Sequence, residues 1–402
     1  MTSIEPYTNS KRILVVTDNY PPDVGGISNV SHGFAKSLSE YHKVLIVAPK
    51  TEEKSPAIDD SSVAEISRTV HARRSGNDWR TGIHLTLLAM HLFKLARRFQ
   101  PDVVLYLRTW PVVLTWPAVR ILGIPYVVYC HGPIDLYASH PTKGLLSAKS
   151  LRKANSIIVN SRYTGSFLEV IRDLDRSKVI KIAPKIDLDP FSIKEDIDDF
   201  KKREGIESRR ILVTVGTIQE LKGQQQVIKT LPSLMERYPS LVYVIVGCGG
   251  YAGELEDLTA QLGLTDHVIF AGDRDVARFL QAADIVLVPS VARGGREESF
   301  GVVALEAAAC GKPVIAGNTG GLREVVDHGK TGLLVDCEDL VELSKTIDRL
   351  LSDPVLAGRL GKEGLQSVQR DGGLDKYAKE FEDKVLPRLP RRGQKNAVFP
   401  VV

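Results

Sequence analysis

Residues 11–48 read KRILVVTDNYPPDVGGISNVSHGFAKSLSEYHKVLIVA, and this stretch decides the fold. Two apolar runs, at 12–17 and 43–48, enclose a segment whose apolar residues return every fourth position from Val30 to Leu38. Continuous apolar runs are typical of parallel strands that are buried on both faces, and the spacing between them indicates an amphipathic helix. The stretch therefore predicts one β-α-β unit.

The same alternation of apolar runs and amphipathic segments continues along the chain. A charged stretch poor in apolar residues, at 192–209, interrupts it, and a new series starts at 211–216. The remaining apolar runs lie at 102–106, 125–129, 156–160, 178–182, 241–247, 267–271, 285–289, 313–316 and 332–335. Repeated units of this kind indicate two doubly wound α/β domains. We place them at 1–190 and 191–385, with a flexible tail at 386–402, and the last helix of the second domain is a candidate to pack back on the first.

Length and composition bound the class of protein. The 402 residues suffice for two or three domains of roughly 100–200 residues each. With 25% charged and 43% hydrophobic residues, the chain as a whole is not of the disordered class. The sequence contains no uninterrupted apolar run of about 18 residues, and its start, MTSIEPYTNSKR, lacks the apolar core of a signal peptide. We therefore expect neither a spanning helix nor a signal peptide.

Four cysteines, at 130, 248, 310 and 337, lie far apart and form no C-x-x-C pair. This spacing is typical neither of a structural zinc site nor of a disulfide framework. We expect thiols in small buried positions and a reducing, cytoplasmic location.

The net charge of +4 is unevenly divided. Residues 1–190 carry 25 Lys and Arg against 17 Asp and Glu, whereas the rest of the chain carries 28 against 32. In the basic half, basic residues precede and follow an apolar stretch at 83–93. These residues are Arg68, Arg73, Arg74, Arg80, Lys94, Arg97 and Arg98. The stretch is either a surface helix that rests on anionic lipid or a core helix with solvated ends, and the first alternative predicts a peripheral protein on the inner face of the membrane.

Glycine-rich turns follow several predicted strands. Gly25 and Gly26 either let the backbone and the helix N–H groups approach an anion closely, or form a plain strand-to-helix turn. The turn after the 211–216 strand contains Lys222, which either places a positive charge on a phosphate or lies in solvent. A further turn at 247–250 lacks the G-x-G-x-x-G spacing, so it supports a dinucleotide-binding site poorly.

Residues 296–311, REESFGVVALEAAACG, are the most informative segment. Ser299 is expected to cap the start of a helix and Gly311 to end it. Helical spacing then separates the Cα atoms of Glu298 and Glu306 by roughly 12 Å. That is too far for the carboxylate pair of a retaining glycosidase. Glu306 lies among apolar neighbours, so it is either a carboxylate that receives ribose hydroxyls, with a diphosphate at the helix start, or an exposed helix residue.

His131 lies at another predicted strand exit, where it is either structural or faces the cleft that we expect between the two domains. Asp-x-Asp occurs four times, at 173/175, 187/189, 196/198 and 273/275, and each pair is a candidate for metal binding. No histidine accompanies any of these pairs to complete a metal triad. We expect neither a metal ion nor another cofactor.

The pair Glu298-x7-Glu306 and the segments around it resemble the retaining glycosyltransferases of family 4, which are GT-B enzymes with two Rossmann-like domains. The other matching segments are Tyr20-Pro21-Pro22 with Gly25-Gly26, Lys222-Gly223, Gly311–Ala316, Gly320–Glu324 and Gly329–Val335. The resemblance covers about residues 11–385, and it is specific in the C-terminal half and loose at 50–120.

This resemblance implies a nucleotide-sugar-dependent hexosyltransferase whose first domain binds the acceptor and whose second domain binds the donor. Glu306 would bind the ribose and Lys222 the diphosphate, while Glu298 and the backbone at 300–302 would hold the donor sugar. Gly25 and Gly26 would lie under the phosphates. The candidate catalytic residues are His131, Lys222 and Glu298, and the candidate donor-binding residues are Gly25, Gly26, Thr217, Gly247, Ser299, Phe300, Gly301, Val302 and Glu306.

Two positions depart from the family's pattern. The family has an arginine after the glycine of the second domain's first loop, where this chain has Thr217. The family's Asn-Gly before the interdomain aspartate is replaced by Lys185-Ile186. Stabilisation of the leaving diphosphate then rests on Lys222, on helix N-termini or on another cation. The candidates for that cation are Arg293 and Arg296.

The reaction that the resemblance implies is retaining and metal-independent. The departing diphosphate oxygen takes the proton of the acceptor hydroxyl on the same face of the sugar, while domain closure excludes water. The expected partners are a UDP- or GDP-sugar donor and a lipid-linked or saccharide acceptor such as an envelope polysaccharide precursor, and no nucleic acid. Two alternatives stay open: another GT-B enzyme, such as a sugar-nucleotide epimerase or a phosphorylase, and a non-catalytic sugar-nucleotide-binding module.

Overall fold

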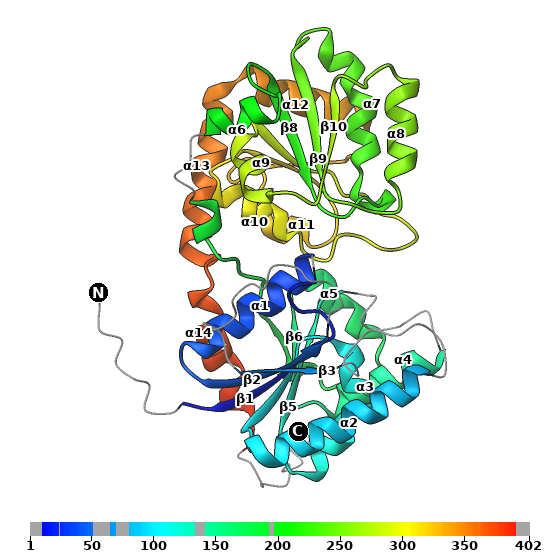
Figure 1. The fold of residues 1–402 in the computed structure, drawn as a ribbon, viewed down its shortest axis with the longest axis vertical. Helices are drawn as coiled ribbons and strands as arrows, with labels where there is room; N and C mark the ends of the chain where they lie inside the picture. Colours follow the sequence, from blue (N-terminus) through cyan, green and yellow to red (C-terminus); the bar gives the residue numbers. More distant parts are fainter. Residues whose placement is uncertain are drawn as a thin grey trace, which may run out of the picture. The chain divides into compact units, whose positions relative to one another are not determined.

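The computed structural model of the protein describes residues 10–23, 25–50, 65–69, 80–132, 141–192 and 197–390. The chain divides into two compact units (Figure 1). The first unit comprises residues 1–185 and 374–402, and the second unit comprises residues 186–373. The chain thus enters the second unit a few residues before the position that we predicted, and it returns to the first unit at Leu374.

Seven strands among the described residues form the parallel sheet of the first unit, in the order β3-β2-β1-β4-β5-β6-β7. They are β1 (Arg12–Val16), β2 (Lys43–Pro49), β3 (Glu65–Thr69), β4 (Val103–Tyr106), β5 (Tyr126–Cys130), β6 (Ser156–Val159) and β7 (Val179–Lys181). In the interior strand β1, Val15 pairs with Ile46 on one side and Leu105 on the other, and it is fully buried. The strand order reverses between β1 and β4, and open α/β sheets bind ligands at such a switch point.

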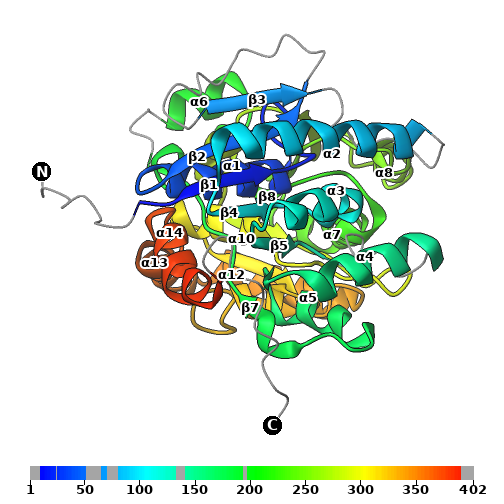
Figure 2. The same cartoon turned by 90° about the horizontal axis from the view of Figure 1, so that it is seen from below.

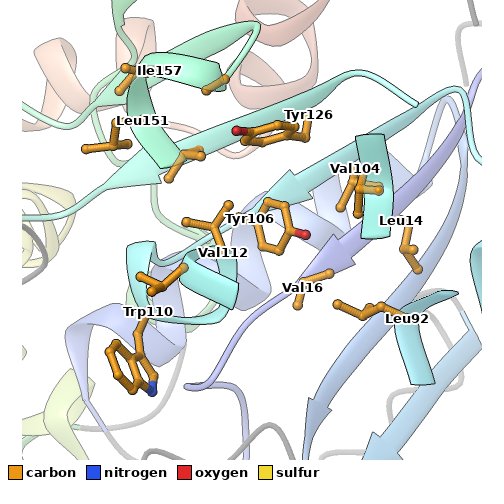
Figure 3. Close-up of a cluster of buried hydrophobic side chains, with 14 of the residues drawn as sticks. Leu14, Val16, Leu92, Val104, Tyr106, Trp110, Val112, Tyr126, Leu151 and Ile157 are labelled. Carbon is orange, nitrogen blue, oxygen red and sulfur yellow. The ribbon is translucent and has the colours of Figure 1, made fainter. Parts of the chain in front are cut away.

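Helices cover both faces of this sheet (Figures 1 and 2). They are α1 (Gly26–Ser39), α2 (Arg80–Phe99), α3 (Thr109–Ile121), α4 (Pro141–Lys153), α5 (Arg162–Ser166) and α14 (Asp375–Lys384), with 3-10 turns at Phe167–Val170, Arg176–Lys178 and Leu386–Arg388. One face packs on α2, α3 and α4. Figure 3 shows this core, in which Leu14 and Val16 of β1 and Tyr106 of β4 lie with Leu92 of α2 and Val112 of α3.

The returning segment packs against α1 on the other face of the sheet. Tyr377 of α14 stacks on Phe34 of α1 with ring centroids 4.4 Å apart, and Phe381 meets the same ring edge-on. Lys185, one of the two departures from the family's pattern, forms a 2.8 Å ion pair with Glu380 of α14. The start of the segment that we predicted as a flexible tail, residues 386–390, continues this packing through a 3-10 turn, whereas residues 391–402 lie outside the described residues.

The second unit contains a parallel sheet of six strands within the described residues, in the order β10-β9-β8-β11-β12-β13. The strands are β8 (Arg210–Val215), β9 (Leu241–Val246), β10 (Val268–Gly272), β11 (Ile285–Val288), β12 (Val314–Gly317) and β13 (Leu333–Val335). The helices are α6 (Ile197–Arg203), α7 (Gln224–Met235), α8 (Ala252–Gln261), α9 (Val276–Ala282), α10 (Val302–Ala309), α11 (Leu322–Val325), α12 (Leu340–Ser352) and α13 (Pro354–Asp371), with 3-10 turns at Asp189–Phe191 and Glu220–Lys222.

Both sheets have the strand order of a Rossmann-like domain, with the first strand of each series inside the sheet and the order reversed beside it. The predicted class, two doubly wound α/β domains, is therefore confirmed. Within the described ranges, no helix combines the length and hydrophobicity needed to cross a bilayer.

Candidate functional site

The candidate residues of the second unit follow the carboxyl ends of its parallel strands. Lys222 follows β8 and Gly247 follows β9, while Glu298 lies in the loop between β11 and α10. Two of these strand exits touch, because a Cβ atom added to Gly247 would lie 2.2 Å from the carbonyl oxygen of Gly216. Gly247 also has a φ of +135°, so packing and backbone conformation alone require glycine at this predicted donor-binding position.

Lys222 and Glu298 form a direct ion pair in the second unit. Lys222 Nζ lies 2.5 Å from Glu298 Oε2, and the Ser290 hydroxyl donates to the same oxygen at 3.0 Å. Burial by itself raises the pKa of the Glu298 carboxyl. The charge and hydrogen bond of Lys222, with the bonds from Ser290 and the Ser299 amide, outweigh burial and hold that pKa below its ordinary value. The two predicted catalytic residues of this unit, Lys222 and Glu298, therefore form one ion pair.

Sequence reasoning missed Ser290, which is buried and shares Glu298 with Lys222. Its position two residues after the end of β11 at Val288 is the signal that could have found it, because polar side chains at the carboxyl ends of parallel strands face the ligand edge of the sheet.

Helix α10 starts later than the sequence predicted. We expected Ser299 to be its N-cap, but the helix begins at Val302 and its N-cap is Gly301, with a φ of +97°. A left-handed backbone favours glycine over serine, so the turn conformation decides the start. The N–H groups of the first turn of a helix lack intrahelical partners, and Phe300, which directly precedes the N-cap, is buried. The end of α10 is as predicted, since Gly311 follows it with a φ of +68°.

Glu306 is a buried carboxylate in the interior of α10. Its residue is 9% exposed, and no hydrogen bond or ion pair to its side chain is formed by any described residue. Burial raises the pKa of this carboxyl to about 7. The structure thus excludes the alternative of an exposed helix residue. A buried carboxylate without a protein partner is costly, which is typical of a group that a ligand completes.

Three positions bear on whether the diphosphate meets a second cation besides Lys222: Thr217, Arg293 and Arg296. Thr217 is exposed, as expected of a residue in a ligand loop or a solvated one. Arg293 is bound by two carboxylates, to Glu220 at 2.9 Å and to Glu338 at 2.5 Å, so its charge is already neutralised. Arg296 is exposed, and its guanidinium has no partner among the described residues. Of the two arginines, Arg296 is therefore the one whose charge remains open to a diphosphate.

Three predicted site residues lie in the first unit, at the carboxyl ends of its strands. His131 follows β5 and is buried, and its Nε2 donates to the carbonyl oxygen of Leu107 at 2.8 Å. Its ring lies against Tyr129 with centroids 4.2 Å apart. Gly25 caps α1 with a φ of +138°, which favours glycine, whereas Gly26 has ordinary geometry and no atom within 4 Å of an added Cβ. Packing within the described residues therefore does not explain the glycine at 26.

Two family models match the chain, one in each half. Residues 24–190 match the model of Glycosyltransferase Family 4, and residues 196–367 match that of Glycosyl transferases group 1. A GDP-mannose-dependent alpha-(1-6)-phosphatidylinositol monomannoside mannosyltransferase of Mycolicibacterium smegmatis is 29% identical over 88% of this chain and 92% of its own. A D-inositol 3-phosphate glycosyltransferase of Corynebacterium urealyticum is 34% identical over 60% of this chain and 59% of its own.

Solved structures share the fold. A crystal structure of Anabaena HepE in complex with UDP and glucose has a TM-score of 0.79 at 20% identity, covering 93% of this chain and 99% of HepE. WaaG, a glycosyltransferase involved in lipopolysaccharide biosynthesis, has a TM-score of 0.70 at 17% identity, covering 93% of this chain and 99% of its own. With both halves matched and the motif residues in place, the chain belongs to the GT-B glycosyltransferases of family 4 (Glycosyl transferases group 1).

Proposed function

We propose that this glycosyltransferase moves a hexose-type sugar from a UDP- or GDP-sugar to a hydroxyl of a lipid-linked or saccharide acceptor, with retention of configuration and without a metal ion. The observation that carries the proposal is that an ion pair and a buried carboxylate occur together, the first in the loop before α10 and the second within α10. The Lys222–Glu298 ion pair precedes α10, and the partnerless carboxylate of Glu306 lies inside it. A cation next to a helix start suits a diphosphate, and a buried carboxylate suits ribose hydroxyls.

Each residue then has a stated role in the reaction. The ribose hydroxyls donate to Glu306, while Lys222, the first N–H groups of α10 and Arg296 neutralise the diphosphate as it leaves. Glu298 accepts from the hydroxyls of the donor sugar and orients Lys222. The leaving diphosphate oxygen takes the acceptor proton on the face from which it departs, so the new bond forms on that face. His131, in the first unit, is assigned to the acceptor side of the reaction, and its hydrogen bond to the Leu107 carbonyl oxygen fixes the ring.

No metal has a role in this proposal. Among the described residues, no three His, Cys, Asp or Glu side chains lie close enough together to hold an ion. Metal independence remains a prediction, and activity in the presence of a chelator tests it.

The acceptor is inferred from the relatives. Their names give a phosphatidylinositol mannoside and an inositol phosphate as the molecules on which they act. We therefore assign this chain an acceptor with a polyol head group, carried on a lipid. Such an acceptor lies in a membrane, so a glycosyltransferase gains from a surface that binds the bilayer.

We infer that α2 supplies this surface through five residues that we call the α2 stripe: Ile83, Leu87, Met90, Lys94 and Arg97. The first three are 48%, 37% and 54% exposed, and the last two are exposed as well. The spacing of three or four residues places all five on one helix face. Leu85, Leu88 and Leu92 form the opposite, buried face, so α2 is at once a core helix and an amphipathic surface helix.

The basic residues before α2 do not extend the stripe. Arg68 donates to the carbonyl oxygens of Pro21 and Pro49, so it supports the glycine loop instead. Arg73 and Arg74 lie outside the described residues, as does the side chain of Arg80.

A panel of nucleotide sugars in a thermal-shift assay tests the donor half of the proposal. A ligand at 100 times its Kd stabilises the folded state by about 2.7 kcal/mol. We expect one UDP- or GDP-sugar to raise the melting temperature of the wild type and not that of Glu306→Ala. Equal shifts in both proteins would contradict the assignment of Glu306. Consumption of that donor without an acceptor would indicate an epimerase, and consumption only with free phosphate a phosphorylase.

A further inference from the structure

Glu297 stands next to Glu298 in the sequence, but its carboxylate contacts a different part of the second unit. Glu297 Oε2 accepts a 2.7 Å hydrogen bond from the Thr319 hydroxyl and a second, shorter one from the N–H of Gly320. Glu298 Oε2 instead accepts from Lys222 and Ser290. The two consecutive carboxylates therefore have different partners: one binds the catalytic lysine, and the other binds the turn that follows β12.

That turn, at 318–321, is in backbone contact with the loop that leads into α10. The N–H of Gly321 donates to the carbonyl oxygen of Glu298 at 2.8 Å. A Cβ atom added to Gly320 would lie 2.1 Å from that oxygen, and one added to Gly321 would lie 2.2 Å from the carbonyl oxygen of Ser299. No side chain fits between the two segments, so the position of the turn determines the position of the Glu298 backbone.

We propose that Glu297 is a positioning residue for sugar transfer: by holding the Thr319-Gly320 turn, it fixes the loop that presents Glu298 and the start of α10. The inference rests on the proposed function, because it assigns Glu297 a part in the reaction and not only in folding. Its carboxylate supplies charge-assisted hydrogen bonds, which are roughly twice as strong as neutral ones. Without them, the turn keeps the neutral backbone hydrogen bond from Gly321 to Glu298 but loses the charged acceptor.

The kinetic consequence follows from where the ligand groups bind. Glu298 and the helix start contact the sugar and the leaving oxygen, where a displacement of about 1 Å can cost up to ~10²-fold in rate. Glu306 binds the ribose about one turn into α10, at a place where β11, β12 and α13 also hold the helix. Loss of Glu297 should therefore lower kcat about tenfold or more and leave the Kd of the nucleoside diphosphate within about twofold.

The experiment compares Glu297→Ala, Glu297→Gln and Thr319→Val with the wild type. The amide oxygen of glutamine accepts both hydrogen bonds, so Glu297→Gln should keep most of kcat, and Thr319→Val, which loses one donor, should fall between the two. Asp348→Ala is the matched control, since Asp348 also accepts from two side chains of this unit, Arg237 and Tyr238, away from the site. It should change stability but not kcat.

Hydrogen exchange of the Gly320 and Gly321 amides reports on the turn directly. We expect faster exchange in Glu297→Ala and near-wild-type exchange in Glu297→Gln. Wild-type kcat in Glu297→Ala, an equal loss in Asp348→Ala, or unchanged exchange would each overturn the inference. If Glu297→Ala does not fold, Glu297→Gln and Thr319→Val carry the same test. A wild type that uses no nucleotide sugar contradicts the proposed function instead, and the exchange data then still decide whether Glu297 holds the turn.

Discussion

At the scale of single residues, the Glu306 carboxylate lowers the stability of the folded protein, and it is also the group to which we assign the ribose. Because burial raises the pKa of its carboxyl to about 7, the folded protein prefers the neutral form. The contribution of this group to stability is complete below the pKa of the unfolded chain, near 4.5, and is lost as the pH rises through about 7. We predict that Glu306→Gln matches the wild type in stability near pH 4 and exceeds it near pH 8 by up to about 3 kcal/mol.

Thermal unfolding at several pH values measures this difference. Glu256→Gln, at an exposed position of α8, serves as the control and should follow the wild type throughout. If Glu306→Gln is no more stable than the wild type above neutral pH, the carboxylate already has hydrogen-bond partners in the free protein. The assignment of Glu306 to the ribose would then lose its physical basis.

Lys222 and Glu298 show the opposite dependence on pH. The pKa of Glu298 is lowered despite burial, so the ion pair contributes stability above the unfolded pKa and loses it as the pH falls through the folded one. Lys222→Ala leaves the carboxylate unpaired, and we expect a loss of about 1–3 kcal/mol near pH 7 that shrinks in acid.

The double variant Lys222→Ala/Glu298→Gln should recover part of that loss, because the remaining amide carries no charge. Melting temperatures near pH 7 and pH 3 give the comparison, with Lys229→Ala on the exposed side of α7 as the control. A loss that is independent of pH would mean that packing, and not charge, holds the pair.

At the scale of the element, the α2 stripe predicts how the first unit meets a membrane. Its apolar part should insert at the level of the head groups, and Lys94 and Arg97 should bind anionic lipid. We predict binding to vesicles with about 30% anionic lipid, none to neutral vesicles, and weaker binding as the salt concentration rises.

Sedimentation with liposomes measures this binding. Replacing Ile83 and Met90 by serine should reduce it several-fold, and replacing Lys94 and Arg97 by glutamate should abolish it. Val341→Ser, at a position of α12 that is 62% exposed, is the control for the loss of surface apolarity. If binding does not change with the charge of the lipid, the salt concentration or these substitutions, the α2 stripe is not the docking surface.

Helix α14 lies at the far end of the sequence, yet it completes the core of the first unit. Tyr377 is fully buried and stacks on Phe34, and Tyr129 meets the Phe34 ring edge-on. Large-to-small changes of buried aromatics cost about 3–5 kcal/mol, so we expect Tyr377→Ala to destabilise the first unit by that order. Limited proteolysis should then cut the first unit before the second, with the exposed Val355→Ala as the control. Simultaneous cleavage of both units would contradict this.

At the scale of the whole molecule, the sequence predicts those parts of the fold in which burial produces a local pattern of apolar residues. Strands such as β1 and β8, which are covered on both faces, appear as apolar runs, and the prediction of two doubly wound domains succeeds for that reason. The edge strand β3, with the sequence EISRT, escapes prediction because its residues are largely half-buried or exposed. The return of the chain through α14, for which the sequence makes the last helix only a candidate, depends on tertiary contacts between residues more than 300 positions apart, which no local period encodes.

The candidate site divides in the same way. Residue types fixed by chemistry, such as Lys222, Glu298 and Glu306, are visible in the sequence because a charge in an apolar or glycine-rich setting is unusual. The partners of these residues are not visible. The structure alone shows that Ser290 contacts Glu298 and that Arg293 is bound by two carboxylates. It also shows the contact between Glu297 and the Thr319-Gly320 turn.

The central claim concerns the whole enzyme: retaining, metal-independent sugar transfer that depends on Lys222 and Glu306. The most direct measurement is transfer from the stabilising nucleotide sugar to a lipid-linked polyol acceptor in excess chelator, with the anomeric configuration of the product read by NMR. We predict a product with the configuration of the donor, and rates lowered about 10²-fold or more in Lys222→Ala and in Glu306→Ala. An inverted product, a reaction that stops in chelator, or variants as fast as the wild type would contradict the account.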